Sequence, residues 1–278
     1  MLRYKVPATS ANLGIGFDTL GIAFNIYDRF EVEKADRWQF SGFLEEHANV
    51  NNLFVKAYKK ACAYKKDKAV PLKVELKADV PSSRGLGSSS CLIVGGIYAY
   101  SALNGNCLTK EEMLKIATSI EGHPDNVAPA IYGGLCVAGN DRVLRLKVSD
   151  KWHFGLWIPD YEVKTSEARK VLKDEIERKD AVSNISASLI AVDALTHFNK
   201  ENIGIIMNDS IHEPYRRKLI KNFAKLKKLA LDKGALAFII SGSGSTCLSI
   251  SDRKLDINVK GIDYREVKVD GLGVRNGK

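Results

Sequence analysis

One ten-residue stretch, PSSRGLGSSS at positions 81–90, constrains the fold of this chain more than any other. Residues 71–80 before it alternate apolar and charged side chains, which predicts a strand with one buried face. Residues 91–104 after it are apolar or small and predict a helix. Gly85 and Gly87 let the backbone bend and approach a ligand closely. This order of strand, loop and helix predicts a phosphate site, because free N–H groups and the helix dipole meet at the helix start.

The loop matches neither of two familiar phosphate-binding patterns. A Walker A motif needs a lysine after its last glycine, and none follows Gly87. A Rossmann loop needs a third glycine, which GLGSSS lacks. Ser88, Ser89 and Ser90 supply hydroxyls that can cap a helix, bind phosphate oxygens or face a magnesium ion. From these residues alone, a serine-capped helix after an ordinary loop remains an alternative.

Charge and cysteine content limit the classes of partner. The 278 residues carry 42 Lys and Arg against 33 Asp and Glu, a formal net charge of +9. Such an excess suits nucleic acid, a membrane surface or small anionic substrates, but the lysines are spread along the chain and no nucleic-acid motif occurs. The five cysteines form no CxxC pair, and no apolar run is long enough to span a bilayer. We therefore expect a cytoplasmic protein that binds neither nucleic acid nor membrane.

Two further segments carry candidate binding side chains. The first, PATSANLGIGFDTLG at residues 7–21, is rich in small polar residues and predicts a loop facing a ligand. Its Asn12 and Asp18 offer an amide and a carboxylate, which suit a small substrate with an ammonium group. A plain turn, in which both residues serve as local caps, is the alternative.

The second segment is EGHPDNVAP at residues 121–129, which brings together Glu121, His123 and Asp125. A carboxylate here can hold magnesium, and the histidine can bind a substrate carboxylate or move a proton. Alternatively, Pro124 begins the next helix at its first position, where polar residues are common. That alternative does not explain Glu121 and His123 together.

Periodicity elsewhere predicts a mixture of strands and helices. Helices are expected over 51–66, 109–120, 165–177, 181–198 and 217–233, and strands over 22–33, 133–138, 143–148, 152–158, 235–240 and 247–250. In the helix over 181–198, a set of apolar residues at helical spacing is expected to face the core: Val182, Ile185, Leu189, Val192 and Leu195. A weak domain seam is expected near residues 150–160.

Taken together, three loops resemble the three motifs of the GHMP kinases, a family named for galactokinase, homoserine kinase, mevalonate kinase and phosphomevalonate kinase. They are VPATSANLGIGFDTLG, PSSRGLGSSS and SGSGST, in the family's order along the chain. Serines at 243 and 245 depart slightly from the third motif. The segment EGHPDNVAPAIYGG resembles the homoserine kinases within that family. The resemblance implies an α+β, two-layer GHMP-kinase fold with an N-terminal half, 1–155, a C-terminal half, 156–278, and the active site in the cleft between them.

The resemblance also implies a reaction, in which ATP phosphorylates the side-chain hydroxyl of L-homoserine. ATP phosphates are expected to contact residues 81–91: Pro81, Ser82, Ser83, Arg84, Gly85, Leu86, Gly87, Ser88, Ser89, Ser90 and Cys91. Magnesium is expected at Ser88 and Glu121. The homoserine pocket is expected at Asn12, Asp18, His123, Asp125, Thr165, Arg169, Arg216 and Gly242, with Gly244 supporting the phosphate loop. The resemblance further implies a homodimer.

The chemical step is less determined by the resemblance. Asp125, Asp18 and Arg169 are the candidate catalytic residues, and either aspartate is a candidate base. Phosphoryl transfer passes through a loose transition state, so positioning and charge neutralisation can suffice. We expect direct in-line transfer without a dedicated general base. The alternatives are a GHMP kinase for mevalonate, a sugar or a shikimate-like alcohol, or a non-catalytic nucleotide- or RNA-binding protein on this scaffold.

Overall fold

A long antiparallel hairpin forms the centre of a seven-stranded sheet in the computed structural model, which describes residues 1–277. The hairpin consists of β1 (Leu2–Ala11) and β2 (Leu20–Lys34). Because β2 has 15 residues, it also pairs with β4 (Leu72–Ala78) near one end and β5 (Leu135–Gly139) near the other. The remaining strands are β3 (Gln39–Ser41), β6 (Arg142–Leu146) and β11 (Arg275–Asn276).

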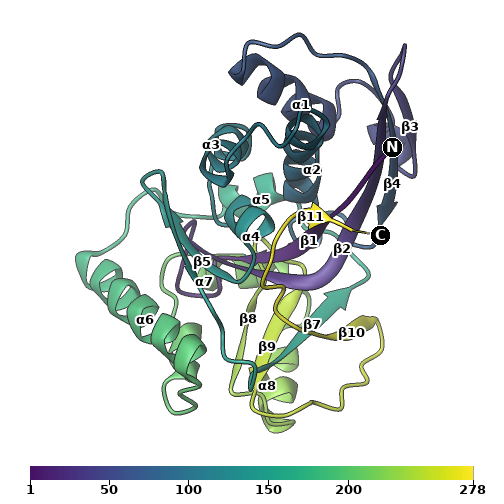
Figure 1. The fold of residues 1–278 in the computed structure, drawn as a ribbon. Helices are drawn as coiled ribbons and strands as arrows, with labels where there is room; N and C mark the ends of the chain where they lie inside the picture. The colour runs from purple at the N-terminus through teal and green to yellow at the C-terminus, as the bar shows by residue number, and fades with distance from the viewer. Residues whose placement is uncertain (278) are drawn as a thin grey trace.

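Four helices lie on one side of this sheet (Figure 1): α1 (Leu53–Tyr64), α2 (Ser88–Leu103), α3 (Lys110–Glu121) and α4 (Val127–Tyr132). Helices α2 and α4 contact its strands, whereas α1 and α3 pack against α2 and against each other. Asn52 caps α1 by accepting a hydrogen bond from the Val55 N–H, and a capping box at Thr109 and Glu112 begins α3. A Cβ on Gly96 would lie 2.2 Å from the Phe54 carbonyl oxygen, so this glycine lets α1 and α2 pack at backbone distance.

A second, antiparallel sheet is formed by four strands from the C-terminal part of the chain. Its strands, in the order β10-β7-β9-β8, are β7 (His153–Pro159), β8 (Ala237–Ile240), β9 (Cys247–Ser251) and β10 (Ile262–Val267). The helices of this half are α5 (Thr165–Lys170), α6 (Arg178–His197), α7 (Glu213–Arg216) and α8 (Phe223–Asp232). Three 3-10 turns complete the described chain: η1 (Glu45–His47), η2 (Ile203–Met207) and η3 (Arg217–Leu219).

The two sheets and their helices form the α+β arrangement that the sequence predicted. Apart from β11, which returns to the first sheet, the strands of the two sheets separate in the chain between β6 and β7, yet one hydrophobic cluster contains residues of both sheets. Phe24 of β2 and Phe154 of β7, for example, have ring centroids 5.5 Å apart. The division into halves at residue 155 therefore stays a prediction. Among the described residues, no helix is both long and apolar enough to cross a membrane.

Two helices are shorter than predicted. The helix expected over 165–177 ends at Lys170, because Ala168 is its only buried residue and a longer helix would have no face to bury. The helix expected over 217–233 begins as α8 only at Phe223. Ile220 is extended and buried, and Asn222 adopts a φ of 60°, which interrupts any continuous helix.

The predicted core face of α6 is also wrong for three of its residues. Val182, Ile185 and Leu189 are 59%, 63% and 70% exposed, and Figure 1 shows α6 at the outer edge of the molecule. The helix instead buries a row of smaller side chains, Ala187, Ala191 and Ala194, together with Leu195. Alanines allow the α6 backbone to approach its neighbours closely. The sequence of α6 thus contains two apolar stripes. The stripe of alanines is buried, and the stripe of larger side chains faces solvent.

Candidate active site

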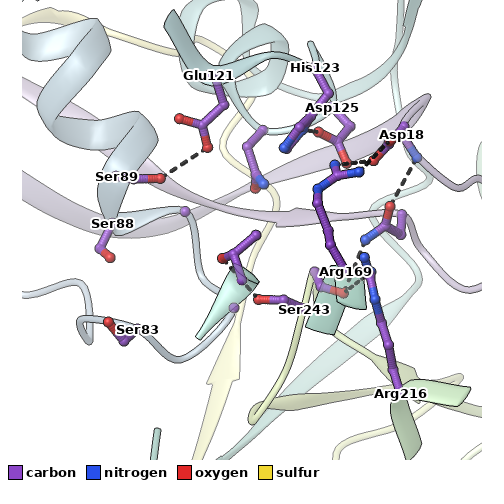
Figure 2. A pocket seen from close by; sticks show the side chains of 16 residues that line it. Asp18, Ser83, Ser88, Ser89, Glu121, His123, Asp125, Arg169, Arg216 and Ser243 are labelled. Carbon is purple, nitrogen blue, oxygen red and sulfur yellow. Dashed lines mark hydrogen bonds and ion pairs between the residues drawn. The ribbon is translucent and has the colours of Figure 1, made fainter. Parts of the chain in front are cut away.

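A cavity of about 120 Å³ opens where loops from both halves of the chain meet, and Figure 2 shows the side chains that line it. Most residues that the sequence predicted for the site lie in its wall. They are Asn12, Asp18, Ser83, Gly85, Gly87, Ser88, Ser89, Glu121, His123, Asp125, Thr165, Arg169, Arg216 and Gly242. Asn126 and Ser243 also line the cavity. Both lie inside predicted segments, but neither was assigned a role in the site.

The glycine loop is held between β1 and the loop at 241–246. The Thr9 N–H donates to the Leu86 carbonyl, and the Ser241 hydroxyl donates to the Gly85 carbonyl at 2.7 Å. Gly85 and Gly87 have φ angles of 72° and 73°. A Cβ on either would lie within 2.2 Å of an oxygen atom, so both positions require glycine.

The start of α2 faces this loop without a capping side chain. Its N-cap residue is Gly87, so the alternative of a serine-capped helix is wrong. Ser88 and Ser89 occupy the first turn and line the cavity. Because α2 has 16 residues and its first-turn N–H groups lack a side-chain partner, this end of the cavity favours an anion.

Glu121, the last residue of α3, reaches the first turn of α2. Its carboxylate accepts a hydrogen bond from Ser89 at 3.0 Å, which Figure 2 shows, and another from Ser90 at 3.4 Å. Burial raises the pKa of Glu121, although the nearby His123 and the serine hydroxyls oppose that shift. A carboxylate and a serine hydroxyl beside a phosphate-binding loop are donors that Mg²⁺ accepts, so these residues fit the predicted ion.

The opposite end of the cavity contains two arginines from different helices. Arg169 of α5 donates two hydrogen bonds to Asp18, at 2.8 and 3.1 Å. Arg216 of α7 is buried and donates to the carbonyls of Ala168 and Gly242. Burial, with a smaller contribution from the charge of Arg169, lowers the pKa of Arg216 to about 10. This end therefore concentrates positive charge and planar hydrogen-bond donors.

Asn12 links the loop at residues 7–21 to the loop at residues 241–246. Its side-chain oxygen accepts from the Asp18 N–H at 2.9 Å, which is a local cap of the kind considered above. Its side-chain nitrogen also donates to the Gly242 carbonyl at 3.0 Å, 230 positions away in the chain. Asn12 thus fixes Asp18 and the third loop relative to each other, which a local turn alone would not require.

His123 and Asp125 form a hydrogen-bonded pair beside Asp18. Asp125 is buried, whereas His123 borders the cavity. Burial favours the neutral histidine, but the hydrogen bond and charge of Asp125 outweigh it and raise the pKa of His123. Helix α4 begins at Val127 with Asn126 as its N-cap, so the alternative of a helix that starts at Pro124 is wrong.

Comparison with known proteins agrees with this geometry. Family models described as "GHMP kinases N terminal domain" and "GHMP kinases C terminal" match residues 52–134 and 191–260. The homoserine kinase of Clostridium beijerinckii is 42% identical over 99% of this chain and 97% of its own, and that of Clostridium botulinum strain Okra is 38% identical over 98% and 97%. The chain belongs to the homoserine kinases of the GHMP kinase family.

A solved homoserine kinase structure is similar throughout. The crystal structure of the Cytophaga hutchinsonii enzyme superposes with a TM-score of 0.87 at 29% identity, covering 99% of this chain and 96% of that one. The GHMP kinase fold that the three motifs implied is therefore confirmed over nearly the whole chain.

One residue of this GHMP kinase site was missed by sequence reasoning. Phe17 lies beneath both arginines, with the guanidinium carbons of Arg169 and Arg216 at 5.7 and 5.2 Å from its ring centroid. The ring of buried His212 stacks on Phe17 at 5.4 Å, and its Nε2 lies 2.6 Å from the Gly14 carbonyl. Phe17 falls inside the first motif, but nothing in the sequence indicated which side chains would meet it.

A second, larger cavity of about 490 Å³ adjoins the first and shares Ser83, Ser88 and Ser89 with it. Apolar side chains make up much of its wall: Phe43, Leu44, Leu53, Leu76, Val80, Pro81 and Leu92. Ser82 also lines it. This cavity lies next to the glycine loop, on the side away from the arginines. It had no counterpart among the sequence predictions.

Four residues predicted to contact ATP phosphates do not line either cavity. Leu86, Ser90 and Cys91 are buried, and the side chain of Arg84 instead donates to the carbonyls of Asp160 and Tyr161. Their side chains serve to hold the loop in place. Any contact that these residues make with a phosphate would therefore come from the backbone.

Proposed function

We propose that this protein transfers the γ-phosphoryl group of ATP to the side-chain hydroxyl of L-homoserine, giving O-phospho-L-homoserine for threonine biosynthesis. The observation that carries the proposal is a single cavity with two chemically different ends. One end is a glycine loop at a helix start, and the other holds Arg169 and Arg216 close to Asp18. An amino acid carries both a carboxylate and an ammonium group, so it matches the second end.

In this proposal, the nucleotide lies across the two adjoining cavities. The larger, apolar cavity takes the adenine base, and Ser83, Ser88 and Ser89 lie where the two cavities join. The phosphates then meet the start of α2, where N–H groups and the helix dipole favour negative charge. The γ-phosphoryl group points toward the arginine end.

Magnesium would be held by Ser88 and Glu121 together with phosphate oxygens. In the structure, the hydroxyl of Ser89 rather than that of Ser88 donates a hydrogen bond to Glu121. We propose that this hydrogen bond is exchanged for the ion, and that Ser88 supplies the hydroxyl ligand. When bound, the ion neutralises charge on the β- and γ-phosphates. Glu121 must lose its proton to serve as a ligand, so its raised pKa makes ion binding weaker at low pH.

The amino acid would be held by its two charged groups. Its carboxylate would bind Arg216 and Arg169, whose planar donors suit a carboxylate. Its ammonium group would bind Asp18. Thr165 lies at the same end, with its hydroxyl 3.4 Å from that of Ser243. The side-chain hydroxyl of homoserine would then face the γ-phosphate.

Asp125 is a poor candidate for a general base in this arrangement. Its carboxylate is already paired with His123, whose raised pKa favours the charged, hydrogen-bonded form. Asp18, His123 and Asp125 have ligand atoms within 4.8 Å of one another, as a metal site would. Both carboxylates already have a cationic partner, however, because Arg169 binds Asp18. We therefore propose that these residues position the substrate, and that transfer is direct and in line.

We also propose that the protein is cytoplasmic and that it forms a homodimer. A reducing, cytoplasmic location is supported by its cysteines, which are all free thiols: Cys62, Cys91, Cys107, Cys136 and Cys247.

The test is ADP release by the purified protein with ATP and Mg²⁺. L-Homoserine would be compared with mevalonate, galactose, L-serine and no acceptor. Turnover with L-homoserine alone is the expected result. Equal or faster turnover with another alcohol would overturn the substrate. A folded protein that binds ATP but turns over none of these acceptors would overturn the proposed reaction.

A further inference from the structure

Helix α6 carries an apolar stripe that no other part of the described chain covers. Val182, Ile185 and Leu189 follow one another at spacings of three and four, which places them in one row along the helix. They are among the most exposed large apolar side chains of the protein, at 59%, 63% and 70%. Ile190 at 37% extends the row sideways. Contiguous apolar rows of this kind mark interaction sites on soluble proteins.

The opposite face of α6 is firmly attached to the protein. Asn184 donates to the Ile15 carbonyl and to Asp209, and Ser188 donates to the same Ile15 carbonyl at 2.9 Å. The buried alanines of α6 complete this contact. The helix therefore cannot turn its apolar stripe inward without breaking buried hydrogen bonds, so burial of the stripe requires a surface from another molecule.

Charges at the two ends of the stripe identify what covers it. Exposed Arg178 continues the row at the N-terminal end of α6, and exposed Asp193 continues it at the C-terminal end. The row thus has a positive charge at its N-terminal end, three apolar side chains in the middle and a negative charge at its C-terminal end. An antiparallel copy of the same helix has the complementary order.

We infer that α6 pairs with α6 of a second copy of this chain, antiparallel about a two-fold axis that passes between Ile185 and Ser186. This inference rests on the homodimer proposed above and assigns its contact surface. Val182 of one protomer then faces the partner's Leu189, since both lie equally far from the axis. Arg178 faces the partner's Asp193 for the same reason. Both ends of the interface gain an ion pair, and the small side chain of Ser186 at the centre allows close approach.

The opposite orientation is unfavourable. A parallel pairing of two α6 helices would place Arg178 against Arg178 and Asp193 against Asp193 at the two ends. Like charges at such positions repel, whereas the antiparallel order pairs opposite charges. Asp193 also contacts His197 within its own helix at 2.8 Å, which leaves its second oxygen for the partner's arginine.

Sedimentation velocity over a range of protein concentrations tests this surface. Wild-type protein is expected to sediment as a dimer. Leu189→Arg is expected to sediment as a monomer, because it places two charges inside the apolar row. Leu272→Arg is the matched control, since Leu272 is 62% exposed and lies between β10 and β11, outside α6. That variant is expected to remain dimeric, and circular dichroism would show that both variants fold.

A charge exchange tests the antiparallel register. Arg178→Asp alone is expected to weaken the dimer, and adding Asp193→Arg in the same chain is expected to restore it. A wild-type monomer would overturn the homodimer and leave the stripe to a different partner. A dimer in Leu189→Arg would overturn the assignment to α6 alone. A double exchange that fails to restore dimerisation would overturn the register. Because these readouts do not use kinase activity, they are independent of the proposed reaction.

Discussion

Arg169 and Asp18 form a two-pronged ion pair across the cavity, although 151 positions separate them in the chain. The pair joins α5 to the first loop at the position proposed for the amino acid. A substrate carboxylate would compete with Asp18 for the same guanidinium, while its ammonium group would take over the contact with Asp18. Binding of a zwitterion would therefore replace one ion pair with two.

Arg169→Lys is expected to weaken L-homoserine binding, because lysine keeps the charge but cannot form the two-pronged contact. Loss of one such charged hydrogen bond corresponds to a KM increase of roughly 10- to 100-fold. The KM for ATP should stay the same. Steady-state kinetics would measure both constants, with Arg142→Lys on exposed β6 as the control. A large fall in kcat at unchanged KM would instead assign Arg169 to the transferring phosphate.

Asp125→Asn tests whether the reaction needs a general base. We expect a raised KM for L-homoserine with kcat within roughly 10-fold of wild type, since Asp125 is proposed to position the substrate through His123. Removing a true base would lower kcat by roughly 10² to 10⁴. His123→Gln should show the same pattern as Asp125→Asn. A kcat loss of that size in Asp125→Asn, at unchanged KM, would make Asp125 the base.

The parts of the site that local chemistry dictates were predictable from sequence. Gly85 and Gly87 adopt positive φ angles next to oxygen atoms, and only glycine fits such positions, so the loop was visible as GLGSSS. The capping box of α3 was visible for a similar reason, because Thr109 and Glu112 act over a single turn. Each of these features depends on a few neighbouring residues.

The parts that depend on long-range packing were not predictable. Phe17 meets Arg169, Arg216 and His212 only after distant segments come together. The second cavity likewise forms between the segment around η1, β4 and α2. For α6, periodicity revealed an apolar stripe but not which of two faces would turn inward. That choice followed from the alanines and from the hydrogen bonds of Asn184, which periodicity does not describe.

Phe17→Leu is expected to raise the KM for L-homoserine about 3- to 10-fold. The aromatic ring lies against two like-charged guanidinium groups, and each such contact contributes roughly 0.5–2 kcal/mol. Phe17→Tyr should retain wild-type kinetics, because it keeps the ring. Phe198→Leu is a matched control, since the Phe198 ring also has two cations, Lys151 and Lys200, within 6 Å. Equal KM values for Phe17→Leu and wild type would contradict this role.

Glu213 makes the stability of the fold depend on pH. Burial raises its pKa to about 7, against the opposing effects of Lys227 and the Ile240 N–H. Between about pH 4.5, where it titrates when unfolded, and pH 7, the folded protein holds a proton that the unfolded chain has lost. Stability from this group is therefore present at low pH and falls as pH rises through that range. The difference amounts to roughly 2–3 kcal/mol.

Glu213→Gln is expected to remove this dependence, because glutamine keeps an acceptor for the Ile240 N–H and has no proton to lose. Urea unfolding at pH 5 and pH 8 would measure it. Asp28, whose pKa burial also raises to about 7, contributes equally to wild type and variant, so the comparison isolates Glu213. Wild type should lose more unfolding free energy than the variant between the two pH values. Glu177→Gln is the control, because it changes an exposed carboxylate, and it should behave as wild type. Equal losses of unfolding free energy in wild type and Glu213→Gln would show that Glu213 titrates normally in the folded protein.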